Sequence, residues 1–130
     1  MSRQTLAQRR AAHAFARIRT HETAGAGSYG NYVSYVEALP ATILMNGLGQ
    51  AAATLLSKAT EAHSLLYSDL QEWLCSADTA VPYRNATGGN DRLMQAIIAK
   101  DERTYLHAQA EALAYLVWLK KFANAWLQRP

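Results

Sequence analysis

Apolar residues recur along most of this chain every three or four positions, the spacing that places them on one face of an α-helix. This spacing predicts helices at about residues 4–20, 60–76 and 101–128. The last of these would be roughly 40 Å long at 1.5 Å per residue. No segment alternates apolar and polar residues over the length of a strand, so the sequence predicts an all-α fold.

Proline and glycine mark the expected breaks between helices. Pro40 lacks a backbone N–H and is tolerated in the first turn of a helix, so we expect one helix at about 31–38 and a new one at about 40–57. Gly47 and Gly49 would lie inside the second of these, where we interpret them as points of close packing. A phosphate-binding loop would need a preceding strand and a following Lys-Ser or Lys-Thr, and neither is present.

The length of 130 residues suits one helical domain with one core. We expect a compact bundle of about five to six helices, with flexible loops at about 22–30 and 77–90 and a long C-terminal helix capped by Asp101. The chain has one cysteine, Cys75, and no apolar stretch typical of a signal peptide or a membrane span. These features predict a cytoplasmic protein.

Charge is distributed unevenly along the chain. Residues 1–21 carry five arginines and no acid, residues 22–102 carry four basic and nine acidic side chains, and residues 103–130 carry four basic side chains against Glu111. The local charges are therefore +5, −5 and +3, which sum to the net +3. Such polarity favours an anionic partner for one face and a basic partner for another, but solvated faces of amphipathic helices explain it equally well.

Three sequence blocks, in this order and spacing, resemble the small subunit of the Cmr-type (type III-B) CRISPR effector complex. The first is YVSYVEALPATILMNGLGQ at residues 32–50, and the second is LYSDLQEWL at 66–74. The third is DERTY at 101–105, followed by EALAYLVWLKKFANA at 111–125. The resemblance covers nearly the whole chain, whereas the glycine-rich stretch at 25–30 and the segment 76–90 match nothing in that pattern.

The resemblance implies a compact helical bundle that has no enzymatic activity and takes part in antiviral defence. It implies partners of two kinds: the other subunits of the effector complex, including further copies of this chain, and the duplex of guide RNA and target RNA. Several copies would stack beside the backbone subunits that hold the guide RNA. It implies no cofactor, no membrane and no small-molecule substrate.

A protein that follows an RNA backbone needs lysine and arginine along an exposed surface, because phosphate contacts supply most sequence-independent affinity. In the first helix, the apolar residues from Ala7 to Ile18 would take one face and the basic residues the opposite face. The residues that we expect to contact RNA are Arg3, Arg9, Arg10, His13, Arg17, Lys58, Lys120 and Lys121. A solvated face or a protein contact is the alternative, and cations near a helix C-terminus are also favoured by the helix dipole.

Aromatic and acidic side chains leave further alternatives open. Trp118 falls on the polar side of the last helix, where it would either stack on a base or pack on a protein. Tyr29, Tyr32 and Tyr35 pose the same alternative, and for Tyr32 and Tyr35 we favour packing. Glu111 is expected on the polar side of the last helix, and Asp69 is expected as a solvated surface acid.

Catalysis finds little support in the sequence. The four histidines are scattered at positions 13, 21, 63 and 107, and no metal-binding pair at helical spacing occurs. Cys75 has no cationic neighbour in the sequence and is expected to be a buried apolar side chain. We therefore predict no catalytic residues and no metal site. Two alternatives to the RNA-contacting subunit are a pure protein-interaction module and a small helical nuclease or DNA-binding regulator.

Overall fold

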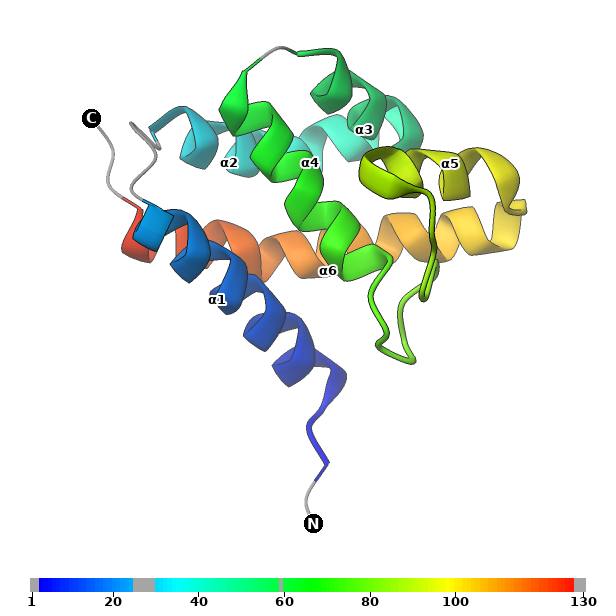
Figure 1. The fold of residues 1–130 in the computed structure, drawn as a ribbon, viewed down its shortest axis with the longest axis horizontal. Helices are drawn as coiled ribbons and strands as arrows, with labels where there is room; N and C mark the ends of the chain where they lie inside the picture. The colour runs from blue at the N-terminus through cyan, green and yellow to red at the C-terminus, as the bar shows by residue number, and fades with distance from the viewer. Residues whose placement is uncertain (1–2, 25–29, 59, 128–130) are drawn as a thin grey trace.

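The computed structural model describes residues 3–24, 30–58 and 60–127, and these ranges form six α-helices and one short 3₁₀-helix without a strand (Figure 1). The elements are α1 (Leu6–Ala24), α2 (Gly30–Asn46), α3 (Leu48–Ser57), α4 (Glu61–Leu74), η1 (Gly89–Asp91), α5 (Arg92–Ala99) and α6 (Glu102–Trp126). The predicted all-α bundle with a long C-terminal helix is thereby confirmed.

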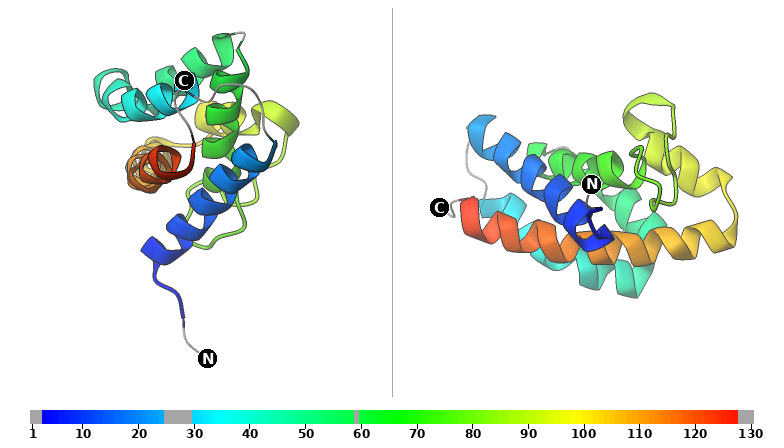
Figure 2. Two further views of the ribbon diagram at one scale, coloured as in Figure 1. Left: turned by 90° about the vertical axis from the view of Figure 1, so that its left-hand side faces the viewer. Right: turned by 90° about the horizontal axis from the view of Figure 1, so that it is seen from below.

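The long helix α6 is the element around which the others pack. Helices α1, α2, α3 and α4 all contact it, and α1 crosses it obliquely, so that the N-terminal end of α1 points away from the body (Figures 1 and 2). The fully buried side chains of α6 include Tyr115, Leu116 and Leu119. They meet Ile18 of α1 and the buried face of α2 in one hydrophobic cluster that includes residues from every α-helix. Tyr32 is fully buried there, as predicted.

The boundary between α2 and α3 lies at Gly47, and the predicted boundary at Pro40 is wrong. Pro40 lies inside α2, where its ring removes one backbone hydrogen bond, but Val36, Leu39 and Ile43 on either side of it are buried. Packing of that face stabilises the continuous helix despite the lost bond. Gly47 instead adopts φ of 88°, a left-handed conformation that ends the helix.

Side chains of α6 satisfy the first backbone N–H groups of α3, which has no side-chain cap of its own. The Leu48 N–H donates to Gln109 Oε1 at 3.0 Å, and the Gly49 N–H donates to the Tyr105 hydroxyl oxygen at 2.9 Å. The predicted close packing at the glycines is therefore confirmed, and the groups that approach are the Tyr105 and Gln109 side chains.

Replacing Gly47 by alanine should destabilise the protein by about 1–3 kcal/mol, because the left-handed conformation disfavours a Cβ. A Cβ at Gly47 would also lie 2.8 Å from the Tyr105 hydroxyl oxygen. Gly49→Ala is the matched control, since its Cβ would meet its neighbours at 3.5 Å or more and should change stability by less than about 1 kcal/mol. Urea unfolding of both variants checks this, and equal effects would contradict it.

The other predicted elements agree with the structure to within a few residues. Asp101 is the N-cap of α6, where its carboxylate accepts from the Thr104 N–H at 2.9 Å, as expected. The predicted glycine loop falls mainly on residues 25–29, which lie outside the described residues, as does Tyr29. The segment between α4 and η1 is tied back to α4, since Tyr83 N–H donates to Leu74 and Asn85 N–H donates to Ser76.

Candidate nucleic-acid interface

Three arginines of α1 each bind a carboxylate from elsewhere in the chain. The Nε atoms lie close to Asp78 at 2.7 Å for Arg9, to Glu111 at 2.6 Å for Arg10, and to Asp69 at 2.7 Å for Arg17. The sequence predicts a free basic face opposite the apolar face of this helix. In the structure these arginines are instead paired with acids of the same chain. Positions 10, 14, 17, 18 and 21 form one helical stripe, so Arg10 and Arg17 share the inward face with buried Ala14 and Ile18.

Asp69 of α4 is the most buried of the three acids, with no exposed surface. Its carboxylate accepts a hydrogen bond from Arg17 Nε and a second one from the Tyr32 hydroxyl. The ring nitrogen Nε2 of His21 lies 2.9 Å and 3.0 Å from the two oxygens of the same carboxylate. Burial, followed by the negative charge of Asp69, raises the pKa of Tyr32 well above its usual value. Helices α1, α2 and α4 thus meet at one carboxylate.

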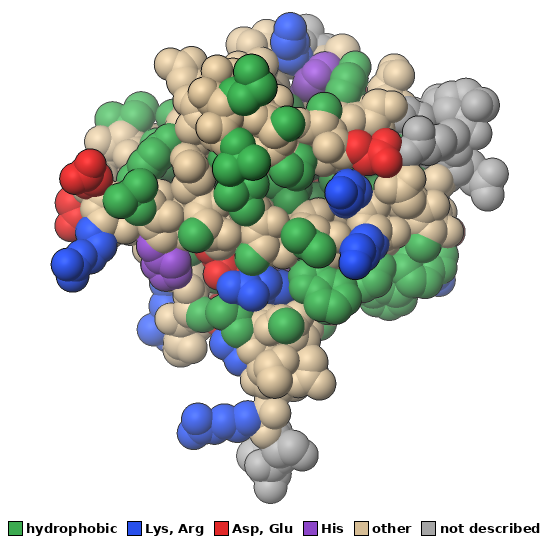
Figure 3. Space-filling view, turned by 180° about the vertical axis from the view of Figure 1, so that it is seen from behind, with side chains coloured by type: hydrophobic (Ala, Val, Ile, Leu, Met, Phe, Trp, Pro, Cys, Tyr) green, Lys and Arg blue, Asp and Glu red, His purple; other side chains and the backbone are tan. Residues whose placement is uncertain are grey.

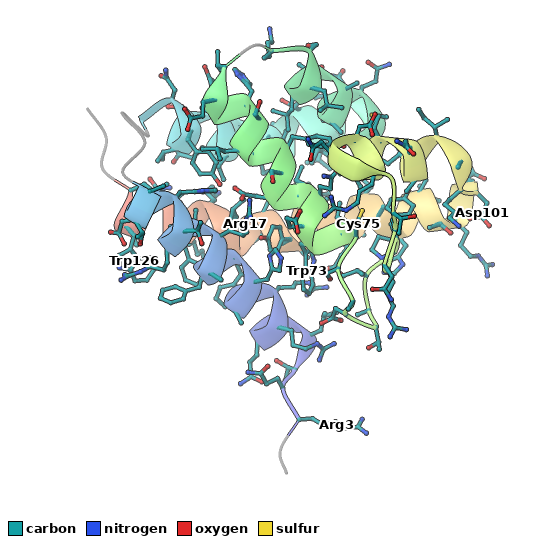
Figure 4. All side chains as sticks on the ribbon, viewed as in Figure 1. Arg3, Arg17, Trp73, Cys75, Asp101 and Trp126 are labelled. Atoms are coloured by element: carbon teal, nitrogen blue, oxygen red, sulfur yellow. The ribbon has the colours of Figure 1, made fainter. Side chains whose placement is uncertain are left out.

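Glu111 of α6 is a second buried carboxylate that joins several helices. We call Asp69 and Glu111, each with its hydrogen-bond donors, the two buried nodes. Its two oxygens accept from Arg10 Nε at 2.6 Å and Arg10 Nη2 at 2.8 Å, and the indole Nε1 of Trp73 donates to it at 2.9 Å. The hydrogen bond from Arg10 to Glu111 raises the pKa of Arg10, so that guanidinium stays charged. This node joins α1, α4 and α6, and Figure 4 shows Trp73 and Arg17 in the layer between α1 and the rest of the molecule.

His13 lies between these two nodes. Its Nδ1 is 2.7 Å from the Tyr115 hydroxyl oxygen, and its ring packs against those of Trp73 and Tyr115. Burial, followed by the nearby charge of Arg17, lowers the pKa of His13. A neutral, half-buried imidazole is a better packing element than a phosphate ligand, although its contact with RNA stays a prediction.

The expectation that Asp69 and Glu111 are solvated acids is wrong. Both are at most 3 % exposed, because each has cationic and neutral donors that replace water. A carboxylate on the inward face of a helix was not distinguishable by sequence from an exposed one until its arginine partner was known. The arginine spacing of seven residues between positions 10 and 17 was the one available signal.

The remaining predicted cations lie at the surface. Arg3, Lys58 and Lys121 are exposed and Lys120 is half-buried. Arg9 is one-third exposed beside Asp78, whose pKa is lowered by the hydrogen bond from Arg9. The structure does not bring the eight predicted residues onto one face, since Lys58 follows α3 while Lys120 and Lys121 lie near the end of α6.

An aromatic ridge runs along the surface where the second half of α6 meets α1. We use this name for Phe15, Trp118, Phe122 and Trp126, whose successive ring centroids lie 5.2–5.9 Å apart. Phe15 is 41 % exposed, and the Arg19 guanidinium lies 5.7 Å from its ring centre. The face in Figure 3 shows cationic side chains beside hydrophobic ones in this part of the molecule.

Neither Phe15 nor Arg19 was predicted from the sequence to belong to a binding surface. The sequence places Phe15 on the apolar face of the first helix, whereas in the structure it is exposed beside the buried stripe. The four-residue spacing of Phe15 and Arg19, and of positions 118, 122 and 126, was the signal that could have shown an aromatic row.

Metal binding, membrane crossing and thiol reactivity find no support in the described ranges. No group of three or more His, Cys, Asp or Glu side chains in them is arranged to hold a metal ion. No helix within them has the length and apolar character needed to cross a membrane. Cys75 is buried, and burial raises the pKa of its thiol to about 11.

Comparison with known proteins gives one consistent result. Residues 6–126 match the family model described as CRISPR-associated protein (Cas_Cmr5). The chain is 30 % identical over 110 residues to the CRISPR system Cmr subunit Cmr5 of Thermus thermophilus, which covers 85 % of this chain and 87 % of that protein. The crystal structure of a CRISPR-associated Cmr5 family protein from Thermus thermophilus superposes with a TM-score of 0.75 at 28 % identity, over 96 % of this chain and 100 % of that one. With this fold and these matches, the chain belongs to the Cmr5 family of CRISPR-associated proteins.

Proposed function

We propose that this protein is a non-catalytic small subunit of a Cmr-type (type III-B) CRISPR effector complex, acting in the cytoplasm in antiviral defence. Several copies stack beside the backbone subunits that hold the guide RNA, and they contact the target RNA. The family match over residues 6–126 is the observation that carries the proposal. The name of the Thermus thermophilus relative, a subunit of a Cmr system, supports it.

The RNA surface that the geometry favours is the aromatic ridge with Arg19, Lys120 and Lys121. Arg19 lies 3.4 Å from Glu22, but that pair is exposed and breaking it would bury no unpaired charge. Phe15 is exposed, and the other three rings are half-buried against the core. Rings that keep part of their surface open beside cations suit single-stranded or splayed RNA, because bases stack on the rings while the cations meet phosphates. Trp118 belongs to this ridge, so base stacking and packing against the core are both open to it. Arg3 and Lys58 stay in the proposal as outlying phosphate contacts.

Arg9, Arg10 and Arg17 have a different principal role in this proposal. An arginine that already holds a carboxylate has fewer donors left for phosphate, and moving it would leave unpaired an acid that is buried for Arg10 and Arg17 and half-buried for Arg9. We infer that these arginines fix α1 on α4, α6 and the 77–90 segment. Their direct contact with RNA, and that of His13, stays a prediction.

Absence of catalysis is also part of the proposal. The two buried carboxylates are saturated by cationic and neutral donors, and the raised pKa of Cys75 keeps its thiol protonated near neutrality. Neither group resembles an activated acid, base or nucleophile.

A pure protein-interaction module is the second candidate. Large apolar side chains on α2 and α6 are exposed, namely Leu44 at 69 %, Met45 at 82 %, Leu106 at 59 % and Val117 at 50 %. Such a surface is typical of contacts between protein subunits. A protein contact at these side chains is compatible with RNA contact elsewhere on the same subunit. The two candidate functions therefore differ in one property, which is whether the free protein binds RNA.

Lys121→Glu should weaken binding of the free protein to a single-stranded RNA. The plot of log K against log salt should become less steep by about 0.7, the value of one phosphate contact. Arg103→Glu is the matched control, since Arg103 is also exposed on α6 but at its other end. Fluorescence anisotropy across a salt series measures both. Equal losses in the two variants would contradict the ridge surface, and no binding by wild type at low salt would favour the interaction module. Reversing Arg9 or Arg10 is a poorer test, because both residues also stabilise the fold.

A further inference from the structure

A cavity of about 500 Å³ lies between the segment that precedes α5 and α5 itself. It is lined by three cationic side chains, and its described lining residues include no carboxylate. Arg84 comes from the connecting segment, Arg92 begins α5, and Lys100 follows its last residue. Figure 1 shows this segment descending from α4 and returning beside the start of α5. The cavity shares no residue with the aromatic ridge.

Two of the three cations have donors available to a ligand. Arg84 uses Nε for a 3.0 Å bond to the Ala77 carbonyl oxygen, and its terminal nitrogens make no hydrogen bond within the described ranges. Lys100 makes no side-chain hydrogen bond or ion pair in the same ranges. Arg92 is different, since its Nη2 lies 2.6 Å from Glu72 Oε2 and its charge is balanced. The positive charge that a ligand could use therefore comes from Arg84 and Lys100, although the carboxylates of Asp78 and Asp101 outside the lining partly offset them.

The wall that carries Arg84 is held in place by the backbone. Tyr83 N–H donates to Leu74 at 3.1 Å, Asn85 N–H donates to Ser76 at 3.0 Å, and the Tyr83 side chain is 2 % exposed. Asn85 has φ of 58°, the one positive value at a non-glycine residue in the described ranges. Asparagine tolerates this left-handed conformation in turns, so the turn is held without added strain. A wall fixed in advance lowers the cost of binding.

The rest of the lining has two kinds of surface. Ala96 and Ala99 of α5, with Pro82 opposite, give small apolar side chains, and Asn85, Thr87 and Gln95 give neutral hydrogen-bonding groups. The volume is within the roughly 300–1,000 Å³ of small-molecule sites. A ligand that combines an anion with a flat, partly apolar body would use both kinds of surface.

We propose that this cavity binds the phosphate ester of a nucleotide. Arg84 and Lys100 hold the phosphate oxygens through charge-assisted hydrogen bonds. The small apolar side chains lie against the ribose or the base. The phosphate could belong to a free mononucleotide or to a nucleotide within an RNA strand, and the chemistry at the cavity is the same for both. The proposal does not rest on RNA contact at the aromatic ridge.

Backbone amide NMR of the full chain, titrated with adenosine 5′-monophosphate, tests this directly. We expect shifts confined to the amides of residues 83–87 and 92–100, and much smaller shifts with adenosine, which lacks the phosphate. Ala99→Glu places a carboxylate in the cavity and should raise Kd at least about tenfold. Ile98→Glu adds the same charge one residue away at a side chain that is 75 % exposed and outside the lining, and should change Kd by less than about twofold.

Three results would overturn the proposal: no shifts at these amides, equal shifts with adenosine, or equal losses in the two glutamate variants. Circular dichroism of each variant separates loss of binding from loss of fold. Competition with a short RNA that has no terminal phosphate then distinguishes the sources. Displacement of the mononucleotide supports an internal phosphodiester as the ligand, and binding of the mononucleotide without displacement supports a free nucleotide.

Discussion

Replacing Asp69 by alanine should lower the free energy of unfolding by about 3–5 kcal/mol, the cost of breaking a buried ion pair from one side. The change removes the acceptor shared by Arg17, His21 and Tyr32. The whole free energy of unfolding of a small domain is about 5–15 kcal/mol, so the variant should lose a large share of its stability. Urea unfolding followed by circular dichroism measures the change.

Glu61→Ala is the matched control for Asp69→Ala, because Glu61 is an exposed acid in the first turn of the same helix. It should cost less than about 1 kcal/mol, the usual contribution of an exposed acid near a helix N-terminus. Asp69→Asn preserves the shape of the side chain but presents an NH₂ group to surrounding donors, so it should also destabilise. If Asp69→Ala cost no more than Glu61→Ala, the carboxylate would not be the node that joins α1, α2 and α4.

The Arg10–Glu111 pair should show strong coupling in a double-mutant cycle. Arg10→Met leaves Glu111 buried with Trp73 Nε1 as its remaining hydrogen-bond donor in the described ranges, and should cost about 3 kcal/mol or more. Glu111→Leu removes the acceptor of both the Trp73 indole N–H and the partly exposed Arg10 guanidinium, and should cost at least about 1–3 kcal/mol. The double variant should be more stable than the sum of the single effects by about 1–3 kcal/mol. Thermal and urea unfolding of all four proteins measure this coupling.

Additive effects in that cycle would show that Arg10 and Glu111 do not stabilise the protein as a pair. Arg10 would then be available for phosphate, as expected from the sequence. Coupling in the predicted range would instead assign this arginine to the fold. The cycle therefore decides, without any RNA in the experiment, whether Arg10 stabilises the fold or is available to contact phosphate.

Much of the fold was predictable because apolar residues at helical spacing indicate which segments form helices. The long helix from Asp101 onward was predicted closely, since one face carries an unbroken apolar stripe and the N-cap has a distinctive residue type. Pro40 misled the prediction because the loss of a single hydrogen bond was weighed without the burial of Val36, Leu39 and Ile43 around it. That burial depends on α4 and α6, which are distant in the sequence.

The candidate site was less predictable, because charge on a helix does not reveal which side faces inward. Arg10 and Arg17 read as a basic surface until Glu111 and Asp69 are seen to lie opposite them, 101 and 52 residues away in the sequence. The family itself was identified correctly, since sequence blocks preserve local packing. The contacts of Phe15 with Phe122 and Trp126 could not be predicted, because they depend on how α1 crosses α6.

Arg10 and Arg17 of α1 thus have a consistent physical role. A helix that buries ion pairs together with Ala14 and Ile18 is held in one orientation, because each pair has a specific geometry. That orientation of α1 places Phe15 beside Trp126 of α6 and so determines the shape of the aromatic ridge. The stability of the buried nodes and the shape of the RNA surface are therefore linked.

The most direct test of the RNA-contacting role is ultraviolet cross-linking within the effector complex assembled from this chain, its partner subunits, guide RNA and target RNA. Mass spectrometry of the cross-linked peptides locates the contact. We expect target RNA to cross-link to the ridge, at Phe15, Trp118 or Trp126, and we expect Lys121→Glu to reduce the yield while Arg103→Glu does not. An assembled complex in which target RNA cross-links to the partner subunits but to no residue of this chain would contradict the RNA-contacting role.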